Sequence, residues 1–330
     1  MRHPSTAESI LELSRNFMES RILLTAAELN LFSLLGPRPL SAAEVAERLQ
    51  GNLRAVTILL DALAAMGFLE KHAERYQCLP PVSTFLSPDR SDSILPMVLH
   101  ASHLWRRWTH LTDAVSGQET RSTAPPAQDE EGLRAFIGAM HAIAAPMASR
   151  IVNAVNPAGA RALLDVGGAS GTYTIAFLLT DPKMKATLFD QPPVIEMARK
   201  PLAEAGVLDR VTLKAGDFYV DELPTGHDLA FLSAIIHQNS PEQNEELFKR
   251  VLRSLRPRGR IVIRDHIMNP DRTEPLSGAV FAVNMLLATE GGNTYTFEEV
   301  GRSLAQVGFI RVRLIQKGEH MDGLVEGFKP

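Results

Sequence analysis

The sequence has a single cysteine, Cys78, in 330 residues, so it can form no internal disulfide and no thiolate metal cluster. It also lacks an excess of either charge. The formal net charge of −4 offers no bulk attraction to nucleic acid or to an anionic membrane. The N-terminus has no apolar segment of the signal-peptide kind. The apolar run at 279–288, interrupted by Asn284, is about half of the ~20 residues that a membrane helix needs. These absences favour a cytoplasmic protein.

What is present is ordinary for a globular chain: 45% of the residues are hydrophobic and 22% are charged. At roughly 100–200 residues per domain, this length predicts two domains. The apolar pattern further divides the chain into three regions, which we expect to span 1–90, 91–155 and 156–330.

The first region reads as a helical winged-helix module. Apolar residues at helical spacing run from Leu11 to Leu35, and Ser41 followed by Glu44 is the capping-box pattern of a short helix. A further helix is expected over 54–66. Two short strands with a polar turn between them complete the helix-turn-helix-hairpin order, at 68–71 and 76–79.

The other two regions differ in kind. The middle region predicts only helices, over 94–115 and over 133–155 with Pro146 as a kink, and an exposed loop at 120–129. The third region alternates strands and helices, which is typical of an open, mostly parallel α/β sheet of Rossmann-like type. Its five parallel strands are expected at 162–166, 186–190, 211–214, 228–232 and 260–264. An antiparallel hairpin is expected at its end, over 310–316 and 324–328.

Three consecutive strands of this sheet end in residues suited to a cofactor. The first runs from Asp165 into a turn with Gly167, Gly168 and Gly171, which misses the spacing of a dinucleotide fingerprint and fits a cofactor without a pyrophosphate. The second ends at Asp190, which can accept hydrogen bonds from ribose hydroxyls. The third is followed by Gly216, Asp217 and Phe218, an acid and a ring for an adenine base. Each element alone is also expected of a loop, a helix cap or core packing, but the three together favour a nucleoside-containing cofactor.

These motifs resemble those of class I S-adenosylmethionine-dependent O-methyltransferases, in the small-molecule branch of the caffeic acid, hydroxyneurosporene and polyketide-tailoring enzymes. The resemblance covers nearly the whole chain, including Phe189-Asp190-Gln191-Pro192 and Gly216-Asp217-Phe218-Tyr219, with Ala169 as a departure in the glycine turn. It implies S-adenosyl-L-methionine as cofactor, and a homodimer formed through the N-terminal winged helix. It also implies that Ser233 stands where the family has a cofactor-binding lysine.

The fourth strand is followed by His237, at the carboxyl end of the sheet beside the glycine turn. A neutral imidazole there suits removal of a phenolic proton, because a phenol titrates near ~10. The resemblance implies that His237 is the general base and that Asp265, 28 residues later, orients it in place of the family's glutamate. Gln238 and Asn239 replace the Asp and Trp that follow this histidine in the family, and Thr294 replaces a second glutamate. The alternative is that Asp265 only caps the end of its strand.

The acceptor site is expected to be lined by the middle helices and by 280–287. The candidates are Trp105, Met140, His141, Met285 and Leu286, for each of which core or dimer packing is the alternative. An aromatic or polycyclic hydroxyl acceptor fits such a wall. The sequence contains no convergent set of metal ligands, so the reaction is predicted to be independent of metal.

Other functions stay open at this point. A winged helix can bind DNA, but 1–90 carries 9 basic and 10 acidic residues, and DNA docking favours a basic face. Enzymes of the same fold can bind the cofactor and catalyse cyclisation, hydroxylation or decarboxylation instead. Methylation at carbon or nitrogen is a further variant.

Overall fold

The computed structural model describes residues 6–88, 90, 93–118 and 130–330. The chain divides into two compact units, Met1–Arg106 and Arg107–Pro330. The loop expected at 120–129 lies outside the described residues.

The N-terminal unit combines helices with a small sheet. Its elements are α1 (Ala7–Arg15), α2 (Phe17–Glu28), α3 (Leu31–Leu35), β1 (Leu40–Ser41), α4 (Ala42–Leu49), α5 (Leu53–Ala65), β2 (Leu69–His72), β3 (Arg75–Cys78), α6 (Pro80–Phe85) and most of α7 (Leu95–Trp108). The capping box is present, since Ser41 Oγ accepts from the Glu44 N–H at 3.2 Å and the Glu44 carboxylate accepts from the Ser41 N–H at 2.7 Å. The strands pair antiparallel in the order β1-β3-β2.

Two long helices expected from the sequence are broken in the structure. The apolar stretch from Leu11 to Leu35 forms three helices, because the chain turns at Asn16 and again at Asn30, which adopts a left-handed backbone. The stretch at 94–115 is likewise divided into α7 and α8 (Leu111–Val115). Apolar spacing continues across both breaks, so periodicity alone does not reveal them.

The C-terminal unit is built on a seven-stranded sheet in the order β11-β12-β8-β7-β4-β5-β6. Five strands are parallel: β4 (Ala162–Val166), β5 (Lys185–Asp190), β6 (Val211–Ala215), β7 (His227–Ser233) and β8 (Leu255–Asp265). The hairpin of β11 (Ile310–Gln316) and β12 (Gly323–Phe328) adds the antiparallel edge. The fold class predicted from the sequence is confirmed. Two strands of two residues each, β9 (Ile267–Met268) and β10 (Tyr295–Thr296), were not predicted.

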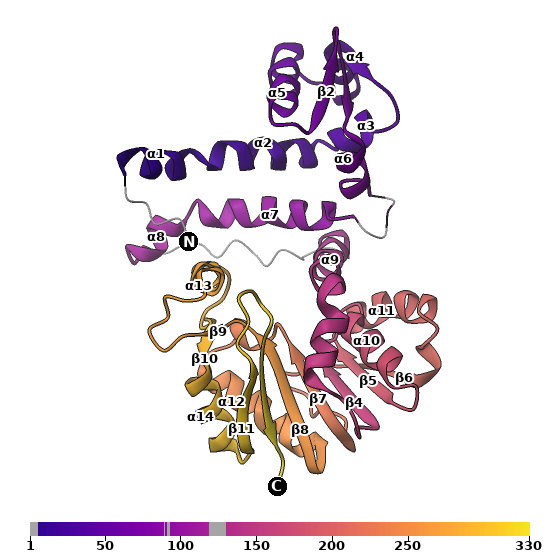
Figure 1. Ribbon diagram of the computed structural model, residues 1–330, viewed down its shortest axis with the longest axis vertical. Helices are drawn as coiled ribbons and strands as arrows, with labels where there is room; N and C mark the ends of the chain where they lie inside the picture. The colour runs from indigo at the N-terminus through magenta and orange to yellow at the C-terminus, as the bar shows by residue number, and fades with distance from the viewer. Residues whose placement is uncertain (1–5, 89, 91–92, 119–129) are drawn as a thin grey trace. The chain divides into compact units, whose positions relative to one another are not determined.

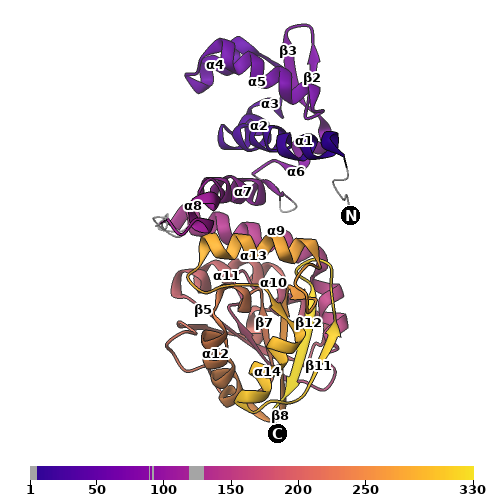
Figure 2. The same cartoon turned by 90° about the vertical axis from the view of Figure 1, so that its left-hand side faces the viewer.

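Helices cover both faces of this sheet (Figure 1). One face carries α9 (Glu130–Val155), α10 (Thr172–Thr180) and α11 (Pro192–Glu204), and the other carries α12 (Pro241–Ser254) and α14 (Phe297–Val307). Short 3₁₀ turns, η1 (Leu208–Arg210) and η2 (Ile236–Gln238), follow α11 and β7. The helix α13 (Leu276–Ala288) lies across the edge of the sheet where the parallel strands end (Figure 2).

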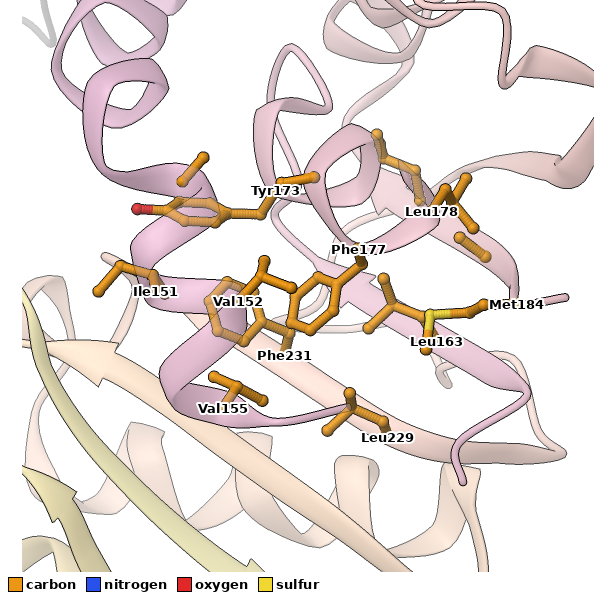
Figure 3. Packing of buried hydrophobic residues seen from close by; sticks show 14 of the residues in the cluster. Ile151, Val152, Val155, Leu163, Tyr173, Phe177, Leu178, Met184, Leu229 and Phe231 are labelled. Carbon is orange, nitrogen blue, oxygen red and sulfur yellow. The ribbon is translucent and has the colours of Figure 1, made fainter. Parts of the chain in front are cut away.

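One described helix is long and apolar enough to cross a membrane by length and composition, at Gly132–Val155 in α9. In the structure its C-terminal half is core. Ile151, Val152 and Val155 belong to the same buried cluster as the aromatic rings of Phe177 and Phe231 (Figure 3). Its apolar character is therefore explained over that half by burial against the sheet.

Candidate active site

The turn after β4 is packed so closely that two of its glycines admit no side chain. A Cβ at Gly167 would lie 2.6 Å from Ile235 Cδ1, and one at Gly168 would lie 2.7 Å from Leu188 Cγ. Ala169 occupies the left-handed region with φ of 49°, a conformation that costs a non-glycine residue roughly 1–2 kcal/mol. Neighbouring side chains fill the space that a Cβ would need at Gly167 and Gly168, and Gly167 also has a φ of 68°, so both positions of this tight turn favour glycine.

Asp165 and Asp190 hold this turn from two strands. The buried Asp165 carboxylate accepts from Thr174 Oγ1 at 2.6 Å, and burial raises the pKa of Asp165 to about 6 despite this hydrogen bond. Asp190 accepts from the backbone N–H groups of Ala169 at 2.8 Å and Gln191 at 2.7 Å. Burial raises the pKa of Asp190, and these two N–H donors oppose that rise. Each Asp190 oxygen keeps a further lone pair with which to accept from a ligand.

The segment after β6 lies beside the same turn. A Cβ at Gly216 would lie 2.4 Å from Phe189 Cζ, which explains the glycine, and Asp217 Oδ1 accepts from the Tyr219 N–H at 2.8 Å. The half-buried Phe218 ring would be 3.6 Å from a Cβ at Gly167. The structure therefore brings together the three strand ends that the sequence singled out.

His237 lies in η2, just past the end of β7, and Asp265 ends the neighbouring strand β8. The imidazole Nδ1 is 2.9 Å and 3.0 Å from the two carboxylate oxygens of Asp265, which is fully buried. Burial raises the pKa of Asp265, but His237 and the backbone N–H of His266 outweigh it and leave that pKa below its ordinary value. An ionised Asp265 accepts from a donor at Nδ1, and in the neutral imidazole with its proton there the lone pair is on Nε2. The carboxylate contacts the ring directly although it is one methylene shorter than glutamate.

A buried polar network fixes the backbone around His237. Asn239 is fully buried and accepts from Tyr219 Oη at 2.6 Å, while its amide donates to Asn244 Oδ1 at 2.9 Å. Asn244 in turn donates to the Ile236 carbonyl at 2.9 Å, and Tyr295 donates to the Asn239 carbonyl at 2.5 Å. This network, which sequence reasoning missed, joins the segment after β6 to the His237 turn.

A second histidine lies beside the pair. Phe281 of α13 has its ring centroid 4.8 Å from that of His237 and 5.0 Å from that of His266. Burial lowers the pKa of His266 to about 4, so its imidazole is neutral at pH 7. Its position next to Asp265 in the chain is the one signal that could have found it.

The predicted lining residues are distributed unevenly. His141 of α9 lies beside the glycine turn, with Nδ1 2.8 Å from Thr172 Oγ1, and burial lowers its pKa. Met140 is half-buried on the same helix. On α13, Met285 is 6% exposed and its neighbour Leu286 is 53% exposed.

Two tryptophans of α7 lie in different environments. Trp105 belongs to the N-terminal unit, where its ring centroid is 6.2 Å from that of Phe17 and lies below the Arg21 guanidinium. Trp108 donates from Nε1 to Asn284 Oδ1 of α13 at 3.1 Å. The polar Asn284 within an apolar helix was the signal for this contact.

Two further observations bear on the expected chemistry. Thr294, which stands where the family has a second glutamate, is buried, whereas the nearby acidic residue Glu290 is exposed. Among the described residues, no group of three or more His, Cys, Asp or Glu side chains is placed to hold a metal ion.

Known proteins share this architecture. Residues 108–310 match the family model of the O-methyltransferase domain, and residues 11–88 match that of the O-methyltransferase dimerisation domain. The chain is 31% identical to the tetracenomycin polyketide synthesis 8-O-methyl transferase TcmO of Streptomyces glaucescens, over 92% of this chain and 91% of that protein. It is 30% identical to the 3-hydroxy-5-methyl-1-naphthoate 3-O-methyltransferase of Streptomyces sahachiroi, over 97% and 94%. The solved structure of PigF with S-adenosylhomocysteine superposes with a TM-score of 0.88 at 25% identity, covering 98% and 100% of the two chains.

The seven-stranded sheet with a glycine turn and acidic strand ends defines a methyltransferase that uses S-adenosylmethionine. The matched domains make the assignment specific. The chain belongs to the O-methyltransferase family and carries that family's dimerisation domain.

Proposed function

We propose that this O-methyltransferase transfers a methyl group to a hydroxyl of an aromatic or polycyclic, natural-product-like acceptor, with His237 as general base. The observation that carries the proposal is the contact of His237 Nδ1 with both oxygens of the buried Asp265, at the carboxyl end of the sheet. The acceptor class is supported by TcmO and the naphthoate enzyme, whose names specify polyketide and naphthoate substrates. Apolar residues of α9 and α13, including Met140 and Phe281, suit such a ring system.

The cofactor's parts match the residues at the three strand ends. When bound, S-adenosylmethionine supplies a methyl group activated on a sulfonium sulfur. Gly167 and Gly168 form the tight turn beside which the cofactor is proposed to bind, and Asp190 keeps lone pairs for ribose hydroxyls. Phe218 and Asp217 suit the face and the amino group of adenine. Asp165 and Gly171 shape the glycine turn, and Gly216 leaves room for the Phe189 ring. Ser233 ends β7, the strand next to β4 in the sheet.

His237 acts on the proton of the acceptor hydroxyl. The imidazole holds its ring proton on Nδ1, which faces Asp265. Its free Nε2 accepts the proton of the acceptor hydroxyl as the hydroxyl oxygen becomes a nucleophile. The ionised Asp265 then stabilises the imidazolium that forms. General-base catalysis of this kind contributes roughly 10²–10⁴-fold.

The remaining parts of the chain suit a homodimer. In the N-terminal unit, α1 and α2 expose apolar side chains that a second copy would cover: Ile10, Leu11, Leu13, Phe17 and Met18. In functional terms we divide the chain into a dimerisation module at 1–90, linking helices beside the acceptor at 91–155 and a catalytic domain at 156–330. The enzyme is proposed to work in the cytoplasm, without nucleic acid or membrane.

The test is incubation with methyl-labelled S-adenosylmethionine and parallel panels of phenols, amines and activated carbon acceptors. The wild type is expected to label phenols, and the label should be released from the product only by cleavage of an aryl methyl ether. Labelling of phenols should be lost in His237→Ala. Label on amines or carbon would contradict O-methylation. Tight cofactor binding without transfer to any panel would favour a non-methylating reaction.

A further inference from the structure

A buried arginine at the carboxyl end of β8 forms no salt bridge with any described carboxylate. Arg264 is 3% exposed, and Nη1 donates to Ser233 Oγ at 3.0 Å while Nη2 lies 3.1 Å from Met147 Sδ. Its guanidinium carbon is 5.3 Å from the centre of the Tyr173 ring. Within the described part of the chain, no carboxylate forms an ion pair with it, and its Nε has no hydrogen-bond partner. An uncompensated buried charge is costly, so a site like this implies an anion.

The nearest carboxylates are engaged elsewhere. Asp265 is next along the strand, so it points to the opposite face of the sheet, where it contacts His237. Asp322 pairs with Arg150 of α9 at 3.0 Å. Burial lowers the pKa of Arg264, and the more distant charges of Asp265 and Asp322 and the Tyr173 phenol oppose this without reversing it. The surroundings of the guanidinium therefore lack negative charge that is not already paired.

The guanidinium lies beside the glycine turn. Ser233 is the register partner of Arg264 on the adjacent strand β7, so both side chains lie on the face covered by α9 and α10. Tyr173 is in the first turn of α10, two residues after Gly171, and its buried hydroxyl also lacks a hydrogen-bond partner. Two buried donors without a hydrogen-bond partner among the described residues, Arg264 Nε and Tyr173 Oη, thus lie in one polar cluster with Ser233 at the carboxyl ends of β7 and β8.

We propose that Arg264 and Tyr173 bind the α-carboxylate of the methionine part of S-adenosylmethionine. This carboxylate is the cofactor's one anionic group, and its planar pair of oxygens matches the fork of a guanidinium. The bound carboxylate then serves as the counter-ion of Arg264, so part of the cofactor's affinity comes from neutralising this buried charge. The proposal rests on the cofactor alone and is independent of the acceptor and of the role of His237.

The test compares two ligands that differ in this part. S-adenosylhomocysteine carries the carboxylate, and 5′-methylthioadenosine lacks the whole amino-acid end. Isothermal titration of the full-length protein with Arg264→Met, which keeps an unbranched apolar stem, should show affinity for S-adenosylhomocysteine reduced roughly 10- to 100-fold. Affinity for 5′-methylthioadenosine should stay within about twofold, because that ligand never reaches the guanidinium.

Matched variants separate binding from folding. Arg150→Met removes a neighbouring, partly exposed cation and should leave both affinities unchanged. Tyr173→Phe removes one hydroxyl and should weaken S-adenosylhomocysteine alone, by a smaller factor. If Arg264→Met does not fold, Arg264→Lys, which keeps the positive charge, replaces it in the same affinity measurements. An equal loss of affinity for both ligands in Arg264→Met, or full affinity of this variant for S-adenosylhomocysteine, would overturn the proposal. It would also be overturned if Arg264→Met impaired only the binding of acceptors that carry a carboxylate.

Discussion

Replacing Asp265 with asparagine would remove one negative charge from the contact with His237 and nearly preserve the shape of the side chain. The asparagine oxygen can still accept from Nδ1, so the ring would keep its orientation. What it cannot do is stabilise the positive charge that the imidazole acquires when it takes the acceptor proton. The variant therefore isolates the electrostatic part of the interaction.

The structure sets the size of the effect. Nδ1 has one hydrogen, shared between Asp265 oxygens at 2.9 Å and 3.0 Å, so the pair counts as a single charge-assisted hydrogen bond. Such a bond contributes roughly 1.5–3 kcal/mol. Because the asparagine oxygen keeps a neutral hydrogen bond of roughly 0.5–1.5 kcal/mol, the loss is about 1–1.5 kcal/mol, and at about 1.4 kcal/mol per tenfold change kcat should fall roughly 5- to 12-fold. KM for the cofactor should change little, because Asp265 lies on the face of β8 opposite the one proposed for the cofactor carboxylate.

The assay is single-turnover methyl transfer to a phenol identified in the panel, for the wild type, Asp265→Asn, His237→Ala and the double variant. Because Asp265 is proposed to act through His237, the second substitution should cost almost nothing once the histidine is gone. A wild-type rate for Asp265→Asn would refute this reasoning. So would a double variant slower than His237→Ala by the full factor, since Asp265 would then act independently.

Three further substitutions test the supports of the site. Burial raises the pKa of Asp165 from 3.8 to about 6, so protonated Asp165 stabilises the fold below pH 4 and this stability is lost as the pH rises through 6. Relative to Asp165→Asn, the wild type should therefore lose on the order of 3 kcal/mol of unfolding free energy between pH 4 and 7, measured by urea titration. Asp190→Ala should weaken S-adenosylhomocysteine roughly 10- to 100-fold in calorimetry, because it removes the ribose acceptor and frees the Ala169 N–H. Tyr219→Phe should lower the unfolding free energy by about 1–3 kcal/mol, since Asn239 Oδ1 would be left buried without its donor.

Each of these has a contrary outcome. Parallel pH profiles for Asp165→Asn and the wild type would mean that Asp165 does not titrate in this range. Full cofactor affinity in Asp190→Ala would remove the ribose role, and unchanged urea midpoints in Tyr219→Phe would remove the network's contribution to stability.

The parts of the fold that sequence predicted best are those in which local pattern and burial coincide. β4 was predicted at its observed bounds, because five consecutive residues are apolar or buried and a glycine turn follows. The two-residue strands β9 and β10 carry no period to detect, and their pairing depends on residues about 28 positions apart. The breaks at Asn16 and Asn30 occur within continuous apolar spacing, so the apolar period gives no sign of them.

The same distinction applies to the site. The pairing of His237 with Asp265 was predicted through a resemblance of spacing, and the structure shows the direct contact. Arg264 was overlooked, because in a strand its charge gives no sign of which neighbours surround it. Asn239 had been noted only as a departure from the family pattern, since its partners Tyr219 and Tyr295 lie 20 and 56 residues away.

The central claim is that His237 removes the proton from the acceptor hydroxyl. Its most direct test is the single-turnover rate of methyl transfer in His237→Ala at saturating cofactor and acceptor, together with the Kd for S-adenosylhomocysteine. The account predicts a rate roughly 10²–10⁴-fold below the wild type and an unchanged Kd. A wild-type rate in His237→Ala, with label still delivered to the same hydroxyl, would contradict it.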